Sequence, residues 1–441
     1  MNKQKWIDHA LANGFESFEI YRSVSEEKTL KYYEGTMESF VTSHVLGTSL
    51  RGLYNGKMAT ISTEDPGDGQ LEELVETMKE QSLVIDAKEN GDILAPETTE
   101  EVSGKREWKD ASSAKLLSLM KEIEEKCLAY DPRIFQVTDM EYTKDTSRRE
   151  ITNSLGLNIS EEEEYAILFA GAAAKEGDDI RNDYKIEVLE DPEHIDTDRF
   201  VKELCEEVLG KLGSSSLPSG TYPVILRYDA MTSLFSAFSS MFSGELIGKG
   251  ISPLKDKLNE KIFSEKITVI DDPKNTDALS IANYDDEGHP TYRKTVVDQG
   301  TFVLALQDTR SAKRMNTVST GNGFKGSYAS AVAVSPLNMN ILKGDKSLKE
   351  LEEQMKDGLV ITDFQGLHAG IDFVTTNFSL QCSGYLVKDG KKEHSVSLIT
   401  AAGNFLDLMK KVEEVGNDGE WSYHRIVAPS ILFSGIAVSG E

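Results

Sequence analysis

The sequence predicts an α+β protein in which two smaller helix-plus-sheet modules precede a larger, sheet-dominated C-terminal domain. The chain has 441 residues, which exceeds the about 250 to 300 residues that one hydrophobic core usually supports. Helical and strand periodicities alternate along it, and two stretches lack either periodicity: a polar, acidic one at 89–110 and a Gly/Ser/Pro-rich one at 210–220. We therefore place the modules at 1–88, 111–213 and 218–441.

The first module is expected to contain a helix, a strand meander and a second helix. The apolar positions of the first helix, Trp6 and Leu11 among them, end at Gly14, a residue suited to the turn after a helix. Residues 17–64 are rich in alternating, β-branched and aromatic positions, and Asn55-Gly56 is typical of a two-residue hairpin turn. The second helix repeats apolar residues on one face at Leu71, Leu74, Val75 and Met78.

The central module repeats this order of elements. A helix near 111–129 carries Leu116, Met120, Ile123 and Cys127 on one face, strands run through 141–190, and a helix near 196–212 closes the unit. The shared order raises the question of an internal duplication, which no sequence identity between the modules supports. Cys127 and the similarly placed Cys205 are interpreted as small core residues.

The C-terminal domain is expected to be rich in strands. It opens with a strand near 220–228 and a helix of Phe, Ser and Met around 229–247, and an acidic helix is expected near 347–356. Many short β-branched stretches occupy the rest, which favours an α+β domain dominated by sheet.

Composition excludes several classes of function. A formal charge of −27 disfavours nucleic-acid binding, since that binding depends on Lys and Arg at the phosphates. No stretch approaches the about 18 apolar residues of a membrane helix, so we expect no membrane partner. The N-terminal residues show no apolar secretory segment, and we expect a cytoplasmic protein. Three distant cysteines without C-x-x-C spacing argue against a disulfide framework or a zinc ribbon.

The residues offer few candidates for catalysis. There is no H-E-x-x-H, no phosphate-binding lysine loop and no G-x-S-x-G. Cys382 as a nucleophile would need a histidine such as His394 or His368 beside it. The densest polar cluster, "YDDEGHPTYR" at 284–293, offers Asp285, Asp286, Glu287 and His289. These are residue types that bind metals or move protons, but a tight acidic turn before a strand explains them equally well, and we favour the turn.

A set of ordered motifs in the C-terminal half resembles the TldD/PmbA family, whose members are also called modulators of DNA gyrase and whose paired members form a zinc-dependent peptidase. The matching stretches, which cover about 218–412, are "SLPSGTYPVIL", "FSGELIGKGISPLKDKLNEKI", "DDEGHPTYRKTVVDQGTF", "STGNG", "TNFSLQCSGYLVKDGK" and "AAGNFLDLM". The first two modules fit the family's N-terminal and central modules more loosely, through "NSLGL" and the overall length.

The resemblance implies a member of the TldE/PmbA type. TldD-type members carry an H-E-x-x-x-H zinc motif, and the equivalent positions here include Gly244, Glu245 and Lys249. Glycine has no ligand and a lysine ammonium would repel Zn²⁺, so both histidine positions are occupied by residues that cannot bind the metal. Glu245 is expected to pair with Lys249 one turn later. We expect no catalytic residue, metal ligand or cofactor in this chain, with zinc only in a TldD-type partner. The family's ligand cysteine is not assigned to Cys382.

Three functions follow as hypotheses. The first is a non-catalytic subunit that pairs with a TldD-type protease subunit and helps bind unfolded peptide as an added strand. The second is a self-standing hydrolase built from Asp285, Glu287, His289 and Cys382. The third is a homodimeric peptide- or protein-binding protein. Candidate partner or cavity faces are the segment 236–256 and the "NFSLQCSGY" strand, and the candidate contact residues are Asn377, Phe378, Ser379, Cys382, Tyr385, Asp286, Glu287 and His289.

Overall fold

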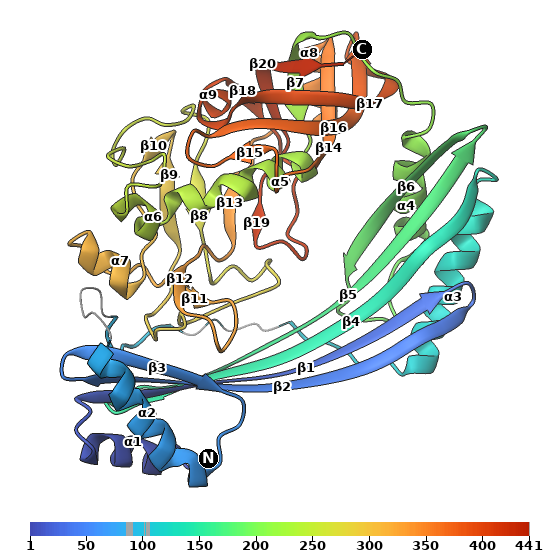
Figure 1. The fold of residues 1–441 in the computed structure, drawn as a ribbon. Coiled ribbons are helices and arrows are strands. Elements are labelled where there is room, and N and C mark those ends of the chain that lie inside the picture. Colours follow the sequence, from blue (N-terminus) through green and yellow to red (C-terminus); the bar gives the residue numbers. More distant parts are fainter. Residues whose placement is uncertain (85–90, 101, 103–105, 441) are drawn as a thin grey trace.

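The protein has the predicted α+β architecture, in a computed structural model that describes residues 1–84, 91–100, 102 and 106–440 (Figure 1). Parts of the predicted first module (85–88) and of the predicted linker (89, 90, 101 and 103–105) lie outside the described residues, as does residue 441. Among the helices of the described chain, none combines the length and the apolar character needed to cross a membrane.

One long, curved sheet runs along the bottom and the right side of the molecule in Figure 1 and underlies the C-terminal domain. Its strand order is β3-β2-β1-β4-β5-β6, and all neighbours are antiparallel. The strands are β1 (Ser17–Tyr33), β2 (Thr36–Tyr54), β3 (Lys57–Thr63), β4 (Ile134–Asn153), β5 (Asn158–Glu176) and β6 (Asp179–Val188). The pairing of β1 with β4 joins strands from the first and central segments, so both segments contribute to a single sheet.

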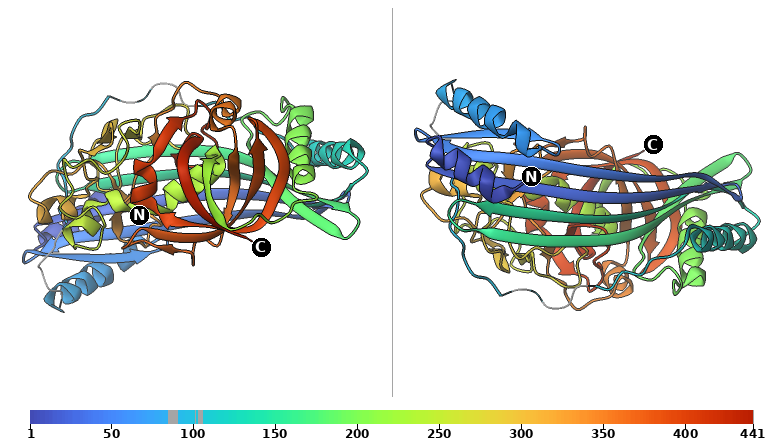
Figure 2. Two further views of the ribbon diagram at one scale, coloured as in Figure 1. Left: turned by 90° about the horizontal axis from the view of Figure 1, so that it is seen from above. Right: turned by 90° about the horizontal axis from the view of Figure 1, so that it is seen from below.

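Four helices cover this sheet in two pairs at its opposite ends, and both pairs lie on the same side of it (Figures 1 and 2). They are α1 (Lys3–Ala12), α2 (Leu71–Val84), α3 (Ser113–Tyr130) and α4 (Thr197–Gly210). Trp6 and Met78 pack with Phe18 and Ile20 of β1 at one end, while Leu30 of β1 joins the core beneath α3 and α4 at the other. This placement follows from the period of two along a strand, because even-numbered residues of β1 share one face.

Local sequence signals in these modules are confirmed. Gly14 follows α1 with φ of 94°, the conformation expected after a helix end. Asn55 and Gly56 form the turn between β2 and β3 with φ of 49° and 68°, as a two-residue hairpin requires. Cys127 and Cys205 are buried on α3 and α4.

The C-terminal domain contains a ring-like sheet and a smaller one. In the larger sheet β14 pairs with both β7 and β16, which closes the circuit β14-β7-β20-β17-β16. Its strands are β7 (Gly220–Leu226), β14 (Gly358–Gln365), β15 (Ile371–Asp372), β16 (Asn377–Lys388), β17 (Lys391–Asn404), β18 (Val412–Val415) and β20 (Ile431–Ser439). The second sheet has the order β10-β9-β8-β13-β19, made of β8 (Val269–Asp271), β9 (Lys294–Asp298), β10 (Thr301–Phe302), β13 (Met339–Ile341) and β19 (Ile426–Val427). A separate pair is formed by β11 (Gly323–Lys325) and β12 (Val332–Val334).

The helix expected around 229–247 is interrupted. The chain forms α5 (Tyr228–Phe238), a short 3₁₀ turn at Ser239–Phe242 and α6 (Gly244–Gly248). Phe238 stacks on Phe405, with 4.6 Å between the ring centres, and Phe242 packs beside Phe263 and Phe302. Because these rings are buried in the core, α6 lies against α7 (Thr309–Arg314). The remaining helices of the domain are α8 (Leu348–Met355) and α9 (Phe405–Lys410).

Candidate functional site

The stretch 244–249, which resembles a zinc motif without its histidines, lies on α6 and its C-cap, and a neighbouring side chain fills the space beside Gly244. Gly244 is buried, and a Cβ atom added there would overlap the carboxamide of Gln307. The Gln307 Oε1 atom is itself buried and accepts no hydrogen bond within the described residues. A histidine at position 244 therefore has no room unless Gln307 moves.

Glu245, the remaining acid of the motif, is held by cations. Its Oε1 atom lies 2.8 Å from Lys249 Nζ, the predicted pair, and 2.9 Å from an Arg310 nitrogen on α7. Partial burial alone would raise the pKa of Glu245, but the Lys249 hydrogen bond and the charges of Arg310 and Arg314 outweigh it and lower the pKa. A general base works best with a pKa near the working pH. Glu245 therefore remains ionised and paired with Lys249 and Arg310, which makes it a poor general base.

These donors do not fit zinc. A zinc site needs about three or four Cys, His or carboxylate ligands around one point, and here the neighbours of Glu245 are glycine, lysine and arginine. Three positive charges beside one carboxylate would repel a dication. Across the described residues, no group of three or more His, Cys, Asp or Glu side chains is placed to hold a metal ion.

The acidic loop, residues 285–289, is buried and its carboxylates are bonded to the protein itself. Asp285 accepts hydrogen bonds from the backbone N–H groups of Glu287, His289 and Gly323, at 3.0, 2.9 and 2.9 Å. Glu287 Oε2 accepts from both the backbone N–H and the hydroxyl of Thr309, at 2.7 and 2.8 Å. The cluster is thus a tight acidic turn just before β9, as the sequence analysis favoured.

This loop also joins the C-terminal domain to the long sheet. Arg149 of β4 lies 2.5 Å from Asp286 and also contacts Glu161 of β5 and the carbonyl oxygen of Tyr284. The other Asp286 oxygen accepts from the Lys325 backbone N–H at 2.8 Å. Burying such charges is tolerated only when they are paired. The loop is therefore a structural clamp between the two halves.

Ionisation of the loop is governed by burial. Burial and the neighbouring Glu287 raise the pKa of Asp285, and burial raises the pKa of Glu287 against the opposing charge of Arg51. Burial lowers the pKa of His289, whose Nε2 lies 3.1 Å from the Thr309 hydroxyl. A neutral His289 bonded to Thr309, the first residue of α7, has a sufficient structural explanation.

The predicted contact strand is β16, and both of its edges are occupied. It pairs with β17 on one side and with β14 and β15 on the other, so no peptide can add a strand there. Asn377 and Ser379 point to solvent, whereas Phe378 and Cys382 are core residues. The Tyr385 hydroxyl donates to Glu352 at 2.5 Å.

The structure does not bring Cys382 to the acidic loop. Cys382 pairs with Phe364 and Ile399 in the ring-like sheet, and His394 pairs with Leu386 further along β17. Burial raises the pKa of Cys382 to about 12, which keeps it a thiol, and the thiolate is the nucleophilic form. The four residues of the hydrolase hypothesis therefore share no site.

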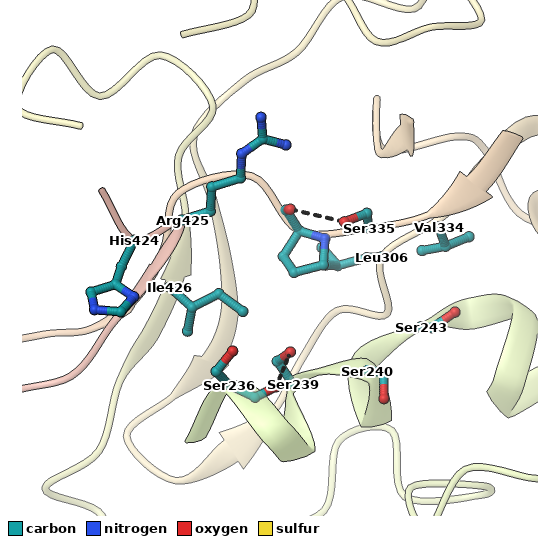
Figure 3. A pocket seen from close by; sticks show the side chains of 11 residues that line it. Ser236, Ser239, Ser240, Ser243, Leu306, Val334, Ser335, His424, Arg425 and Ile426 are labelled. Carbon is teal, nitrogen blue, oxygen red and sulfur yellow. Dashed lines mark hydrogen bonds between the residues drawn. The ribbon is translucent and has the colours of Figure 1, made fainter. Parts of the chain in front are cut away.

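A cavity of about 340 Å³ opens beside the degenerate motif (Figure 3). Ser243, the residue that caps α6 and precedes Gly244, contributes to its wall. Figure 3 shows four serines along the α5–α6 segment on one side of the cavity and His424, Arg425 and Ile426 on another, with the Arg425 guanidinium pointing away from the serines. The full lining is Ser236, Ser239, Ser240, Ser243, Leu306, Val334, Ser335, Pro336, His424, Arg425 and Ile426. We call this the serine cavity.

Sequence reasoning found one wall of the serine cavity and missed the other. The segment 236–256 was a predicted cavity face, and its serines do line the cavity. His424 and Arg425 are brought there because β19 pairs in parallel with β13, at Met339–Ile426. A parallel pairing between residues so distant in sequence leaves no local signal.

The fold can be compared with that of known proteins now that the residues around Glu245 have been described. Three domain profiles of one family match the chain: PmbA/TldA metallopeptidase domain 1 at 18–82, the central domain at 106–212 and the C-terminal domain at 219–440. The chain belongs to the PmbA/TldD family.

Relatives and solved structures agree. A PmbA metalloprotease homologue of Haemophilus influenzae is 27% identical over 335 residues, 75% of this chain and 71% of that protein. A crystal structure of a proposed modulator of a DNA gyrase from Thermotoga maritima superimposes with a TM-score of 0.89 at 30% identity, covering 99% of both chains. TldE from Thermococcus kodakarensis shares the fold, with a TM-score of 0.90 at 22% identity over 99% of this chain and 100% of that one.

Proposed function

We propose that this chain is a cytoplasmic, non-catalytic subunit that pairs with a zinc-bearing, TldD-type chain and helps bind unfolded peptides for proteolysis. One observation carries the proposal: Glu245 is neutralised by Lys249 and Arg310 while Gln307 fills the place of a ligand. Membership of a family of metallopeptidases supports a role in proteolysis. The lack of zinc donors around Glu245 supports the proposal that another chain carries the chemistry.

Reconstitution with a TldD-type subunit tests this function. We expect the mixture to cleave an unfolded protein, each chain alone to be inactive, and the complex to contain one zinc ion held by the partner. Glu245→Gln in this chain should leave the rate unchanged, whereas the same substitution at the motif glutamate of the partner should abolish it.

The outcomes separate the alternatives. Cleavage by this chain alone in the presence of zinc would support a self-standing hydrolase and overturn the proposal. A stable homodimer that binds peptide but ignores the TldD-type subunit, measured by light scattering, would support the binding-protein alternative. Proteolysis by the partner at the same rate without this chain would also contradict the proposal.

A further inference from the structure

The serine cavity stands out because its lining contains no carboxylate in a strongly acidic chain. The protein carries a formal charge of −27 with 75 Asp and Glu residues, yet none of them lines this cavity. The charged lining residue is Arg425, which is exposed and forms no ion pair with any described residue. The local charge is therefore opposite in sign to that of the whole molecule.

Several hydrogen-bond donors of the cavity are uncommitted. The hydroxyls of Ser236 and Ser240 are exposed and bond to no residue within the described chain. Burial lowers the pKa of His424, so its imidazole is neutral near pH 7. The cavity thus offers two hydroxyls, an imidazole and one guanidinium, a set that matches a single carboxylate better than a multiply charged anion.

Two unpaired strand edges flank the cavity. β19 is the last strand of its sheet, and β12 pairs only with β11 in the described chain. Ile426 of β19 and Val334 of β12 both line the cavity. Such edges present free backbone N–H and C=O groups to an extended chain. A peptide that paired with either edge as a strand could place a side chain or its terminus in the cavity between them.

We propose that the serine cavity binds a carboxylate of an extended peptide, with Arg425 as its charged partner and Ser236 and Ser240 as hydrogen-bond donors. The carboxylate comes either from the peptide's C-terminus or from an Asp or Glu side chain. This proposal rests on the proposed function in that it names the peptide class that this subunit prefers.

Arg425 also borders a second cavity, which it shares with Glu163 of β5. This second cavity, of about 170 Å³, lies between the long sheet and the C-terminal domain. One Glu163 oxygen, Oε1, is buried and accepts no hydrogen bond within the described residues. Glu163 and Arg425 form no ion pair, but removing the Glu163 charge should make an Arg425 orientation toward the second cavity less favourable and so tighten carboxylate binding in the serine cavity.

Calorimetric titration of the full chain with one short, uncharged peptide tests the proposal. The peptide is used in three forms: amidated, with a free C-terminus, and amidated with one internal Glu. We expect at least one carboxylate form to bind about tenfold tighter than the neutral form, and high salt to reduce that preference. The form that gains affinity identifies the source of the carboxylate.

Variants locate the binding at the serine cavity. Arg425→Ala should erase the preference, Arg425→Lys should retain part of it, and Glu163→Gln should strengthen it. Lys349→Ala, which removes the same charge from an exposed position on α8, is the matched control and should bind like the wild type. Unchanged melting temperatures would show that each variant is folded.

Two results would overturn the proposal: equal affinity for all three peptides, or a preference that survives Arg425→Ala. If the reconstituted complex cleaves neutral amidated peptides as fast as carboxylate-bearing ones, this proposal fails while the proposed function stands. Absence of any peptide binding, alone and in the complex, would overturn both.

Discussion

The acidic loop at 285–289 and the serine cavity differ in how their polar groups are engaged. The loop is the densest cluster of potentially catalytic residues in the sequence, but its carboxylates are buried and accept hydrogen bonds from the backbone and from Thr309. The serine cavity looks ordinary in sequence, yet it is open and two of its hydroxyls are uncommitted.

The difference shows that availability, and not density, identifies a binding surface. A buried acid whose partners are backbone N–H groups stabilises a loop, and withdrawing it to bind a ligand would leave those donors unsatisfied. An exposed hydroxyl or guanidinium can exchange water for ligand at little cost. Substitutions in the loop should therefore affect stability, and those in the cavity should affect binding.

The largest expected effect is from Arg149→Ala at the clamp. The substitution leaves Asp286 and Glu161 as mostly buried charges without their partner, so we expect the free energy of unfolding to fall by about 3 to 5 kcal/mol. Urea unfolding followed by tryptophan fluorescence measures the change.

Arg148→Ala is the matched control, because Arg148 is the neighbouring residue in β4 and its side chain is half exposed. Its loss should cost less than about 1 kcal/mol. Equal effects of the two substitutions would show that the loop does not clamp the two halves.

A smaller effect is expected from Gly244→His at the degenerate motif. The new side chain overlaps Gln307, and overpacking of this kind costs about 1 to 3 kcal/mol. Gln307→Ala in the same chain should recover about 1 kcal/mol of that loss as a coupling energy in a double-mutant cycle. Additive losses would mean that Gln307 does not fill the ligand's place.

Sequence reasoning predicted the local features of the fold and missed features that depend on distant pairing. The helix end at Gly14 and the hairpin turn at Asn55-Gly56 follow from backbone preferences that act over a few residues. The joining of both N-terminal segments into one sheet and the closure of β14 onto β16 depend on strand pairing across long stretches of chain. Residue types and spacing carry no record of such pairings.

The same division holds for the candidate site. Gly244 and Lys249 could be identified from sequence as residues that cannot bind zinc, because the ability to bind a metal is a property of residue type. Arg425 could not be identified, since its position at the serine cavity depends on the parallel pairing of β19 with β13. Asp286 and Glu287 were candidate contact residues in a cluster that the sequence analysis favoured as a tight turn, and in the structure they bond to Arg149 and to Thr309 of α7.

The long sheet supplies a pH-dependent prediction. Burial, together with the charges of Glu27 and Glu163, raises the pKa of Asp145 on β4 to about 6. Since the folded pKa exceeds the usual value of 3.8, the unfolded chain loses this proton at lower pH than the folded one. Stability from this group therefore falls as pH rises from about 4 to about 6 and is constant above.

Asp145→Asn should therefore stabilise the protein at pH 7 by up to about 1 kcal/mol, because Asp145 is only half buried and solvent screens part of the effect. The gain should disappear at pH 4. Asp139→Asn, which removes the same charge from an exposed position of the same strand, is the control and should not stabilise the protein at pH 7. A gain at pH 7 that persists at pH 4 would mean that it does not arise from ionisation.

The smallest effect on stability is expected in the serine cavity itself. Ser236 and Ser240 make no side-chain hydrogen bonds within the described residues, so replacing both with alanine should change the free energy of unfolding by no more than about 0.5 kcal/mol. Ser239→Ala is the matched comparison, because this buried hydroxyl donates to the Ser236 carbonyl oxygen at 2.8 Å and its loss should cost about 1 kcal/mol. A large loss in the double variant would show that these hydroxyls support the fold, and the distinction between the cavity and the acidic loop would no longer hold.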